Sequence, residues 1–279
     1  TEPWKGEHLM DFGEIATRGL VILGCGKMGS AMLQGWLREG LDPNAVWVSD
    51  PAPSDWLNAQ GVHVNDGLPE APAMVVVAVK PQMMGDALPS IKAFGGGGSV
   101  FLSIAAGTMI ARFEDALGAD TPIVRAMPNT PAAIGRGITA VIGNEHVSEA
   151  ALSLAERLLS AVGQTVRLTQ EADMDAVTAV SGSGPAYVFH LIETLAAAGV
   201  AEGLAPDLAM SLAKATVAGA GALAEAAEES PGQLRVNVTS PAGTTAAALE
   251  VLMNEDDGFP QLLRRAVAAA ANRGRELGS

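Results

Sequence analysis

The chain has 279 residues, of which 48% are apolar and 4% aromatic, and its formal net charge is −14. The apolar share is enough for a sizeable core and too high for a disordered chain, while the acidic surface disfavours nucleic-acid binding as a main function. The length suggests one large or two ordinary domains, and the single cysteine fits a reducing cytoplasm.

The N-terminal residues 1–18 mix charged and apolar side chains without the apolar block of a secretory signal. We interpret them as an N-terminal extension or a non-native remnant. The longest clean apolar stretch of the first half, residues 74–79, is far too short to span a bilayer, so we expect no membrane association.

Short apolar runs alternate with helical patterns through the first half of the chain. The runs at residues 19–23, 46–49, 74–79, 100–104 and 123–126 predict strands, and several are apolar throughout, as is typical of strands buried on both faces. The repeated strand–helix–strand order predicts a Rossmann-like α/β domain with a doubly wound parallel sheet over residues 19–168. Residues 138–142 and 165–168 are candidate strands near its edge, with a helix at 148–162 between them.

After residue 168 the strand signal stops, and an all-α domain is predicted over residues 169–279. Its helices are expected at 185–202, 207–229, 242–253 and 259–277. The first has a narrow polar stripe on an otherwise apolar cylinder, which predicts burial nearly all round. So few bulky residues make a thin core for a free-standing domain, and we therefore predict an obligate dimer through this half. Simple helix propensity without a special interface is the alternative.

A glycine-rich turn is the strongest motif of the first half. It consists of Gly24, Cys25, Gly26, Lys27, Met28 and Gly29, directly after a predicted strand and at the start of a helix. This context is typical of a dinucleotide-binding turn, in which the first glycine makes the bend, the second admits a pyrophosphate and the third lets helix and strand pack closely. A plain strand–helix turn is the alternative, and Cys25 is interpreted as a small turn residue rather than a nucleophile.

Asp50 ends the second predicted strand, 21 residues after Gly29. An acid at this distance usually binds the ribose 2′-hydroxyl of NAD and repels the 2′-phosphate of NADP. Asp50 therefore favours NADH, unless it is only a turn residue before Pro51.

Several further stretches are not expected of a generic Rossmann domain. They are AVKP at 78–81, SIAAG at 103–107, RAMPNTP at 125–131, SGSGPAY at 181–187, PGQL at 231–234 and NVTSPAGTT at 237–245. In this order they closely resemble pyrroline-5-carboxylate reductase, from about residue 19 to 277. The resemblance implies reduction of 1-pyrroline-5-carboxylate to L-proline with NADPH or NADH, the last step of proline biosynthesis. It also implies a helical dimerisation domain, and dimers that often assemble into decamers.

The same resemblance implies the site residues. The glycine-rich turn holds the pyrophosphate, and Asn65 matches an asparagine that contacts the adenosine ribose. The residues around the nicotinamide are Ala78, Val79, Lys80, Pro81, Ile104, Ala105, Ala106, Met127, Pro128, Asn129 and Thr130. The substrate loop comprises Val238, Thr239, Ser240, Pro241, Ala242, Gly243, Thr244 and Thr245, and Glu228 matches an acid contributed across the dimer.

Two positions depart from the pattern of the family. Ala242 stands where members commonly have glycine, which limits the backbone angles available there. Asp50 replaces a residue that is often neutral, which places the usual NADPH preference in doubt.

The chemistry of imine reduction agrees with the loop at 238–245. Ser240 is predicted as the N-cap of helix 242–253 with Pro241 at its first position, so that free N–H groups there bind the substrate carboxylate. Thr245 lies one turn along, and we expect its hydroxyl to bind the ring nitrogen, as a proton donor or only to orient the ring. An ordinary capping motif is the alternative. Lys80 is either a residue that binds substrate charge or a surface lysine.

Rival functions fit less well. A β-hydroxyacid dehydrogenase would carry a catalytic lysine on the helix after residue 181, and residues 181–193 contain none. The four histidines, His8, His63, His146 and His190, show no ligand spacing, so no metal is predicted. A nucleotide sensor that binds the cofactor without turnover is the non-enzyme alternative.

Overall fold

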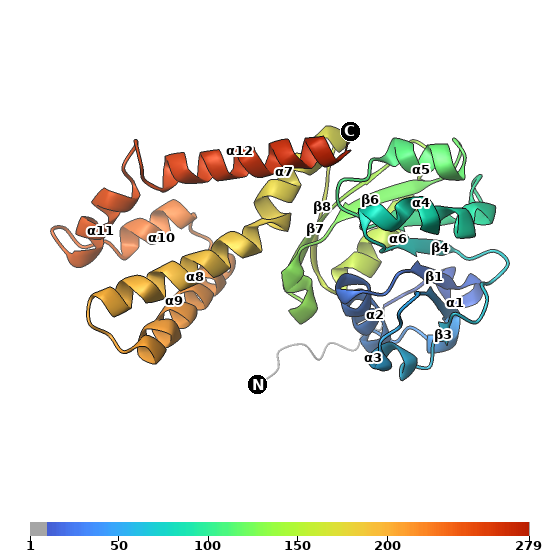
Figure 1. Ribbon diagram of the computed structural model, residues 1–279, viewed down its shortest axis with the longest axis horizontal. Helices are drawn as coiled ribbons and strands as arrows, with labels where there is room; N and C mark the ends of the chain where they lie inside the picture. The colour runs from blue at the N-terminus through green and yellow to red at the C-terminus, as the bar shows by residue number, and fades with distance from the viewer. Residues whose placement is uncertain (1–9, 279) are drawn as a thin grey trace. The chain divides into compact units, whose positions relative to one another are not determined.

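The computed structural model describes residues 10–278 (Figure 1), and the chain divides into two compact units. The first runs to Gly182 and also includes the C-terminal segment from Asn272; the second is Ser183–Ala271. The division differs from the predicted one at residue 168, because residues 169–182 and 272–278 belong to the first unit. The N-terminal residues 1–9 lie outside the described part of the chain.

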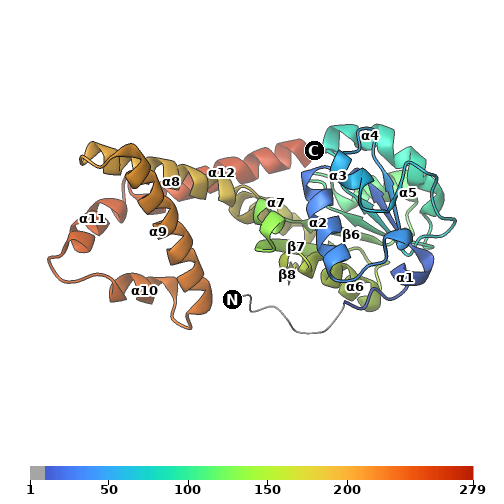
Figure 2. The same ribbon diagram turned by 90° about the horizontal axis from the view of Figure 1, so that it is seen from below.

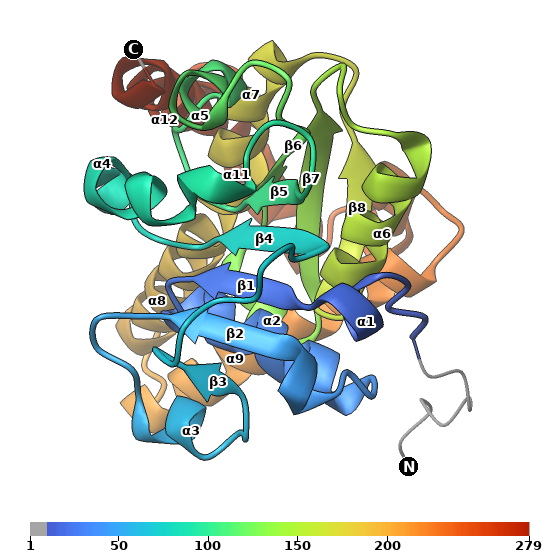
Figure 3. The same ribbon diagram turned by 90° about the vertical axis from the view of Figure 1, so that its right-hand side faces the viewer.

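The first unit is built around an eight-stranded sheet with the strand order β3-β2-β1-β4-β5-β6-β7-β8 (Figure 3). Strands β1 to β6 are parallel, β7 is antiparallel to β6, and β8 is parallel to β7. The strands are β1 Leu20–Leu23, β2 Val46–Ser49, β3 His63–Val64, β4 Met74–Val77, β5 Val100–Ser103, β6 Ile123–Met127, β7 Gly137–Gly143 and β8 Gly163–Arg167.

The largely parallel sheet confirms the predicted fold class, and the predicted strands agree with the observed ones within about two residues. Sequence reasoning missed β3, because two residues are too few to show a strand pattern. It also did not foresee the antiparallel direction of β7, since hydrophobic patterning carries no information on strand direction.

Side chains of each central strand alternate between two cores. Leu20 and Ile22 of β1 lie in the core that contains Trp36, whereas Val21 and Leu23 lie in the core that contains Phe113. All four β1 residues are buried for this reason, which explains why the strand is apolar throughout.

Helices cover both faces of the sheet. The first core contains residues of α1 Ile15–Arg18, α2 Lys27–Arg38, α3 Asp55–Asn58 and α6 Glu149–Ser160. The second contains residues of α4 Met84–Ala87, the 3-10 segment Leu88–Phe94 and α5 Ile110–Leu117. Shorter segments are the 3-10 turns Pro43–Ala45, Pro81–Met83, Thr130–Ile134 and Glu171–Asp173, helix α7 Met174–Val177 and the π-helix Thr178–Gly182.

Residues 10–18 are part of the first unit rather than an appended extension. Phe12 and Ile15 are buried in the first core. Arg18 donates from Nε to the backbone oxygen of Ala71 and from Nη2 to that of Pro72, each over 3.2 Å. Residues 10–18 thus pack as part of the first unit, which a pattern of so few apolar side chains does not reveal in the sequence.

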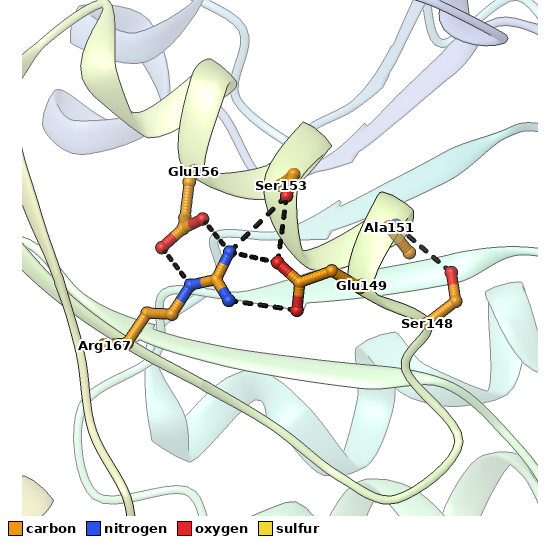
Figure 4. A network of polar contacts seen from close by, with 6 residues as sticks. All are labelled: Ser148, Glu149, Ala151, Ser153, Glu156 and Arg167. Carbon is orange, nitrogen blue, oxygen red and sulfur yellow. Dashed lines mark hydrogen bonds and ion pairs between the residues drawn. The ribbon is translucent and has the colours of Figure 1, made fainter.

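An arginine bound between two glutamates joins the edge strand β8 to helix α6 (Figure 4). Arg167 contacts Glu149 over 2.7 Å and Glu156 over 2.6 Å. The hydrogen bond from Arg167 holds the pKa of Glu149 below its ordinary value. Ser148 caps α6 by accepting the N–H of Ala151. The predicted helix between the two edge strands is thus confirmed.

The second unit is helical. Its elements are α8 Gly184–Ala201, α9 Pro206–Ala226, α10 Pro231–Asn237, α11 Thr244–Leu252 and α12 Phe259–Gly278, whose last residues reach into the first unit. Helices α8 and α9 lie side by side as a hairpin (Figure 2), with Ala196, Ala209 and Ala213 buried between them. Small side chains at the contact allow the two helices to approach closely.

The helical half departs from prediction in three ways. The helix predicted to end at 229 ends at Ala226, the one predicted to begin at 242 begins at Thr244, and α10 was not expected. Within one chain α8 keeps an exposed apolar face, since Val188 and Phe189 are 43% and 59% exposed. No helix in residues 10–278 is long and apolar enough to cross a membrane.

Candidate cofactor and substrate sites

The carboxyl ends of the parallel strands bring the predicted cofactor residues to one edge of the sheet. The glycine-rich turn follows β1, Asp50 follows β2, Ala78 follows β4 and Ile104 follows β5. From β1 the order proceeds to β2 on one side and to β4 on the other. Such a reversal opens a crevice at the strand ends, which is where nucleotides bind in open α/β sheets.

The three glycines of the turn each meet a separate backbone requirement. Gly24 has a φ of +84°, and an added Cβ would lie 2.8 Å from Cγ1 of Val79. At Gly29 an added Cβ would lie 3.0 Å from the backbone oxygen of Gly24, whereas at Gly26, the exposed N-cap of α2, nothing lies within 4 Å. Gly24 thus makes the bend and Gly29 allows close packing, while the backbone at Gly26 stays open. This arrangement is a cradle that fits a pyrophosphate.

Cys25 is a structural residue of this turn. Its side chain is buried, and its backbone N–H donates to Oδ2 of Asp50 over 2.6 Å. Burial raises the pKa of the Cys25 thiol. At neutral pH it therefore stays protonated and poorly nucleophilic, in agreement with its interpretation as a small turn residue.

Asp50 and Asn65 form a clamp at the end of β2. Oδ1 of Asp50 accepts the N–H of Ala52 at 2.8 Å, opposite the bond from Cys25. The side chain of Asn65 accepts the N–H of Asp50 at 3.0 Å and donates to its backbone oxygen at 2.8 Å. Asn65 itself has a φ of +53°, which asparagine tolerates better than most residues. The two predicted ribose residues therefore lie together.

Backbone hydrogen bonds between neighbouring parallel strands continue past the last residues of β4 and β5. The N–H of Ala78 donates to the oxygen of Leu23 over 2.8 Å, and that of Ile104 to the oxygen of Val77 over 3.0 Å. Ala78 and Ile104 are half-buried. Val79 and Ala105 are buried, while Lys80, Pro81 and Ala106 are exposed.

Asn129 joins two of the stretches that sequence reasoning singled out. Its Nδ2 donates to the backbone oxygen of Ser181 over 3.1 Å, and its Oδ1 accepts the N–H of Ile138 over 2.9 Å. Cε of Met127 lies 2.8 Å from where a Cβ at Gly182 would be. Pro128 is buried and Thr130 is exposed. The cleft residues predicted at 127–130 are thus held against residues 181–182.

Sequence reasoning missed a buried ion pair that joins β6 to the 3-10 turn Glu171–Asp173. Arg125 of β6 is 5% exposed, and its Nη1 lies 2.6 Å from Oε1 of Glu171. The same oxygen accepts the N–H of Ile110 at the start of α5, over 2.9 Å. An arginine within an otherwise apolar strand is the only signal of this pair in the sequence.

The substrate loop has a different geometry from the one predicted. The oxygen of Ser240 accepts the N–H of Gly243 over 3.1 Å, and Ala242 has a φ of +57°. Ser240 and Pro241 thus form a β-turn instead of the N-cap and first position of a helix, and Gly243 is the N-cap of α11. The prediction was wrong because serine–proline suits both a helix start and a turn. The free N–H groups lie at the first turn, from Thr244 onward.

The remaining predicted substrate residues surround this turn or precede it. Thr245 is half-buried in the first turn of α11, and Thr239 donates from its hydroxyl to the oxygen of Arg235 over 2.6 Å. Val238 is exposed, and Glu228 is exposed in the connection that follows α9. Between residues 10 and 278 no group of His, Cys, Asp and Glu forms a metal site, and His8 lies outside this range.

A doubly wound sheet with a dinucleotide cradle at its switch point, followed by a helical unit, defines the class of NAD(P)-dependent oxidoreductases. Residues 171–277 match the family described as pyrroline-5-carboxylate reductase dimerisation, and residues 19–107 match NADP oxidoreductase, coenzyme F420-dependent. The pyrroline-5-carboxylate reductase of Pseudomonas aeruginosa is 38% identical over 269 residues, which cover 94% of this chain and 98% of that protein. This chain belongs to the pyrroline-5-carboxylate reductase family.

Solved structures agree with the family. The pyrroline-5-carboxylate reductase of Coxiella burnetii is 34% identical, with a TM-score of 0.87 over 94% of this chain and 99% of that one. The pyrroline carboxylate reductase of Plasmodium falciparum, solved with NADP bound, is 30% identical, with a TM-score of 0.82 over 95% and 99% of the two chains. The resemblance found in the sequence motifs is thereby confirmed.

Proposed function

We propose that this protein reduces 1-pyrroline-5-carboxylate to L-proline, the last step of proline biosynthesis, with NADPH or NADH as the reductant. The observation that carries the proposal is the cradle of Gly24, Gly26 and Gly29 in a chain of this family. The bound dinucleotide supplies a hydride to the imine carbon. The protein contributes binding, orientation and electrostatics.

In the first unit, we assign the pyrophosphate to the open backbone of Gly26 and the N-terminal turn of α2, where N–H groups and the helix dipole favour an anion. Asp50 and Asn65 bind the adenosine ribose. Ala78 to Pro81, Ile104 to Ala106 and Met127 to Asn129 position the nicotinamide at the strand ends.

In the second unit, we assign the substrate carboxylate to the Ser240 hydroxyl and the free N–H groups of the first turn of α11. These are the N–H groups of Thr244 and Thr245, which follow the N-cap Gly243; the predicted N-cap was Ser240, three residues earlier. The hydroxyl of Thr245 binds the ring nitrogen. A hydroxyl is a weak acid, so Thr245 orients the ring or relays a proton to it rather than acting as a strong donor.

The helical unit forms a homodimer in this proposal, with dimers assembling further into a decamer. Support comes from the dimerisation family matched over residues 171–277 and from the thin core of the unit, which consists of small alanine side chains. Large apolar side chains remain exposed on the same helices, among them Val188, Phe189, Leu208, Leu212, Leu223 and Leu262. A second copy would remove this surface from water. The single, protonated Cys25 suits the cytoplasmic location that we propose.

The decisive experiment measures oxidation of NADH and of NADPH by the purified protein with 1-pyrroline-5-carboxylate, together with the L-proline formed. Turnover that depends on the imine and yields proline supports the proposal. Cofactor binding without turnover would instead support the binding-only alternative. Light scattering during size-exclusion chromatography tests the assembly, and a monomeric mass would contradict the dimer.

A further inference from the structure

We propose that the cofactor site selects NADH over NADPH because the Asp50 carboxylate is locked beside the glycine-rich turn, where a 2′-phosphate would have to bind. The inference rests on the proposed function only in that both use the same dinucleotide site. It concerns the charge and the rigidity of this part of the site.

Asp50 is fixed at four atoms. Its two carboxylate oxygens accept the N–H groups of Cys25 and Ala52, over 2.6 and 2.8 Å. Its backbone N–H and oxygen are paired with the side chain of Asn65, over 3.0 and 2.8 Å. Hydrogen bonds to a charged acceptor are about twice as strong as neutral ones. The carboxylate therefore cannot turn away to make room for a second anion without breaking the bonds that shape the turn.

The unused acceptor capacity of Asp50 suits ribose hydroxyls. An ionised carboxylate accepts about four hydrogen bonds, and only two are taken by backbone N–H groups. The 2′- and 3′-hydroxyls of NADH are donors that match the remaining lone pairs. A 2′-phosphate is a dianion with only acceptor oxygens near neutral pH, so it meets like charge and finds no donor on Asp50.

The segment that follows β2 supplies no lysine or arginine to offset this repulsion. Residues 49–67, which run from the end of β2 past β3, carry Asp50, Asp55 and Asp66 and contain neither lysine nor arginine. His63 is the one basic side chain of the segment. Its ring stacks on Trp47 at 4.7 Å, and its Nε2 lies 3.2 Å from the oxygen of Asn44, which precedes β2. His63 is thus engaged with Trp47 and Asn44 rather than with Asp50.

Lys27 provides the matched control. It is the first residue of α2, inside the glycine-rich turn, and exposed. At this position it is near the pyrophosphate site, and the pyrophosphate is common to both cofactors. Loss of the Lys27 charge should therefore weaken NADH and NADPH by similar factors, while loss of the Asp50 charge should change their ratio.

Calorimetric titration of the wild-type protein with NADH and with NADPH tests the inference without any turnover. We expect NADH to bind at least tenfold more tightly, and ADP-ribose to bind more tightly than its 2′-phosphorylated form by a similar factor. Equal or tighter binding of NADPH would overturn the inference. Because no imine is needed, selective binding of NADH without imine reduction would contradict only the proposed function.

Two variants locate the cause of the selectivity. Asp50→Asn keeps the shape and one acceptor but removes the charge, and should move the ratio of the two dissociation constants at least tenfold towards NADPH. Ala52→Arg adds a cation at an exposed neighbour without touching the Asp50 bonds, and should tighten NADPH several-fold with little change for NADH. Lys27→Ala should leave the ratio within about twofold. An unchanged ratio in both Asp50→Asn and Ala52→Arg would refute the role of Asp50, provided that thermal unfolding shows folded variants.

Discussion

The side chain of Asn129 connects β6 to the π-helix at 178–182 through its 3.1 Å hydrogen bond to the backbone oxygen of Ser181. Its second bond, from the N–H of Ile138, ties the same amide to the start of β7. One buried side chain thus links three segments next to the proposed nicotinamide position. Asn129 therefore supports the site by holding these backbone segments together through its two side-chain hydrogen bonds.

Replacing Asn129 tests this architectural role. Asn129→Ala removes both bonds and leaves the partners unpaired, so we expect the free energy of unfolding to fall by about 2 kcal/mol in urea. Thr130→Ala, at the exposed next position, is the control and should change it by less than about 0.5 kcal/mol. Equal stability of the two variants would show that the Asn129 bonds are dispensable.

Substitutions at two glycines of the turn should separate an effect on cofactor affinity from an effect on protein stability. Gly26→Ala adds a methyl group to open space, so thermal stability should be retained while cofactor affinity falls at least about tenfold through the lost pyrophosphate approach. Gly29→Ala places its Cβ 3.0 Å from a backbone oxygen and should cost about 1–3 kcal/mol of stability. Differential scanning calorimetry and cofactor titration distinguish the two effects. Unimpaired binding by Gly26→Ala would remove the pyrophosphate assignment.

The hydroxyl of Thr245 is expected to act in turnover rather than in cofactor binding. Thr245→Val keeps the volume of the side chain and should lower kcat about 10- to 100-fold, while cofactor affinity stays within about twofold. Thr245→Ser restores the hydroxyl and should recover most of the rate. If Thr245→Val turns over imine as fast as the wild type, the assignment to the ring nitrogen is wrong.

Ala242 adopts a backbone conformation that glycine tolerates better. At its φ of +57°, an L-residue with a Cβ is disfavoured by about 1–2 kcal/mol. Ala242→Gly should therefore raise the free energy of unfolding, by about 0.5–1 kcal/mol after the extra entropy of the unfolded glycine is included. The same change at the exposed helical Ala248 should lower it by about 1 kcal/mol. Opposite signs in chemical unfolding are the expected result.

The edge-strand network should make stability depend on pH. The hydrogen bond from Arg167 lowers the pKa of Glu149 in the folded state, so its stabilising effect is complete above the pKa of the unfolded chain. The effect is lost as the pH falls through the lower folded value, below the ordinary glutamate pKa of about 4.3. Wild type and Arg167→Gln should therefore differ in stability at pH 7 and converge in acid. A constant difference across the pH range would indicate packing rather than charge.

The sequence by itself determined the features that depend on local backbone conformation and on the periodicity of hydrophobic residues. The strands of the first half are apolar because both faces of the sheet are covered. The three glycines of the turn are required by the backbone conformation and the close contacts at their own positions. These signals are short-range, so they survive in the linear pattern. The motifs at 125–131 and 181–187 identified the family for the same reason.

Tertiary structure alone decided which distant residues meet. Asn65 clamps Asp50 across 15 residues, Glu171 pairs with Arg125 across 46, and Ser181 binds Asn129 across 52. Each contact depends on strand order and chain direction, which no local pattern encodes. The start of α11 also differed from prediction, because serine–proline suits both a turn and a helix start, and the pattern does not say which of the two forms.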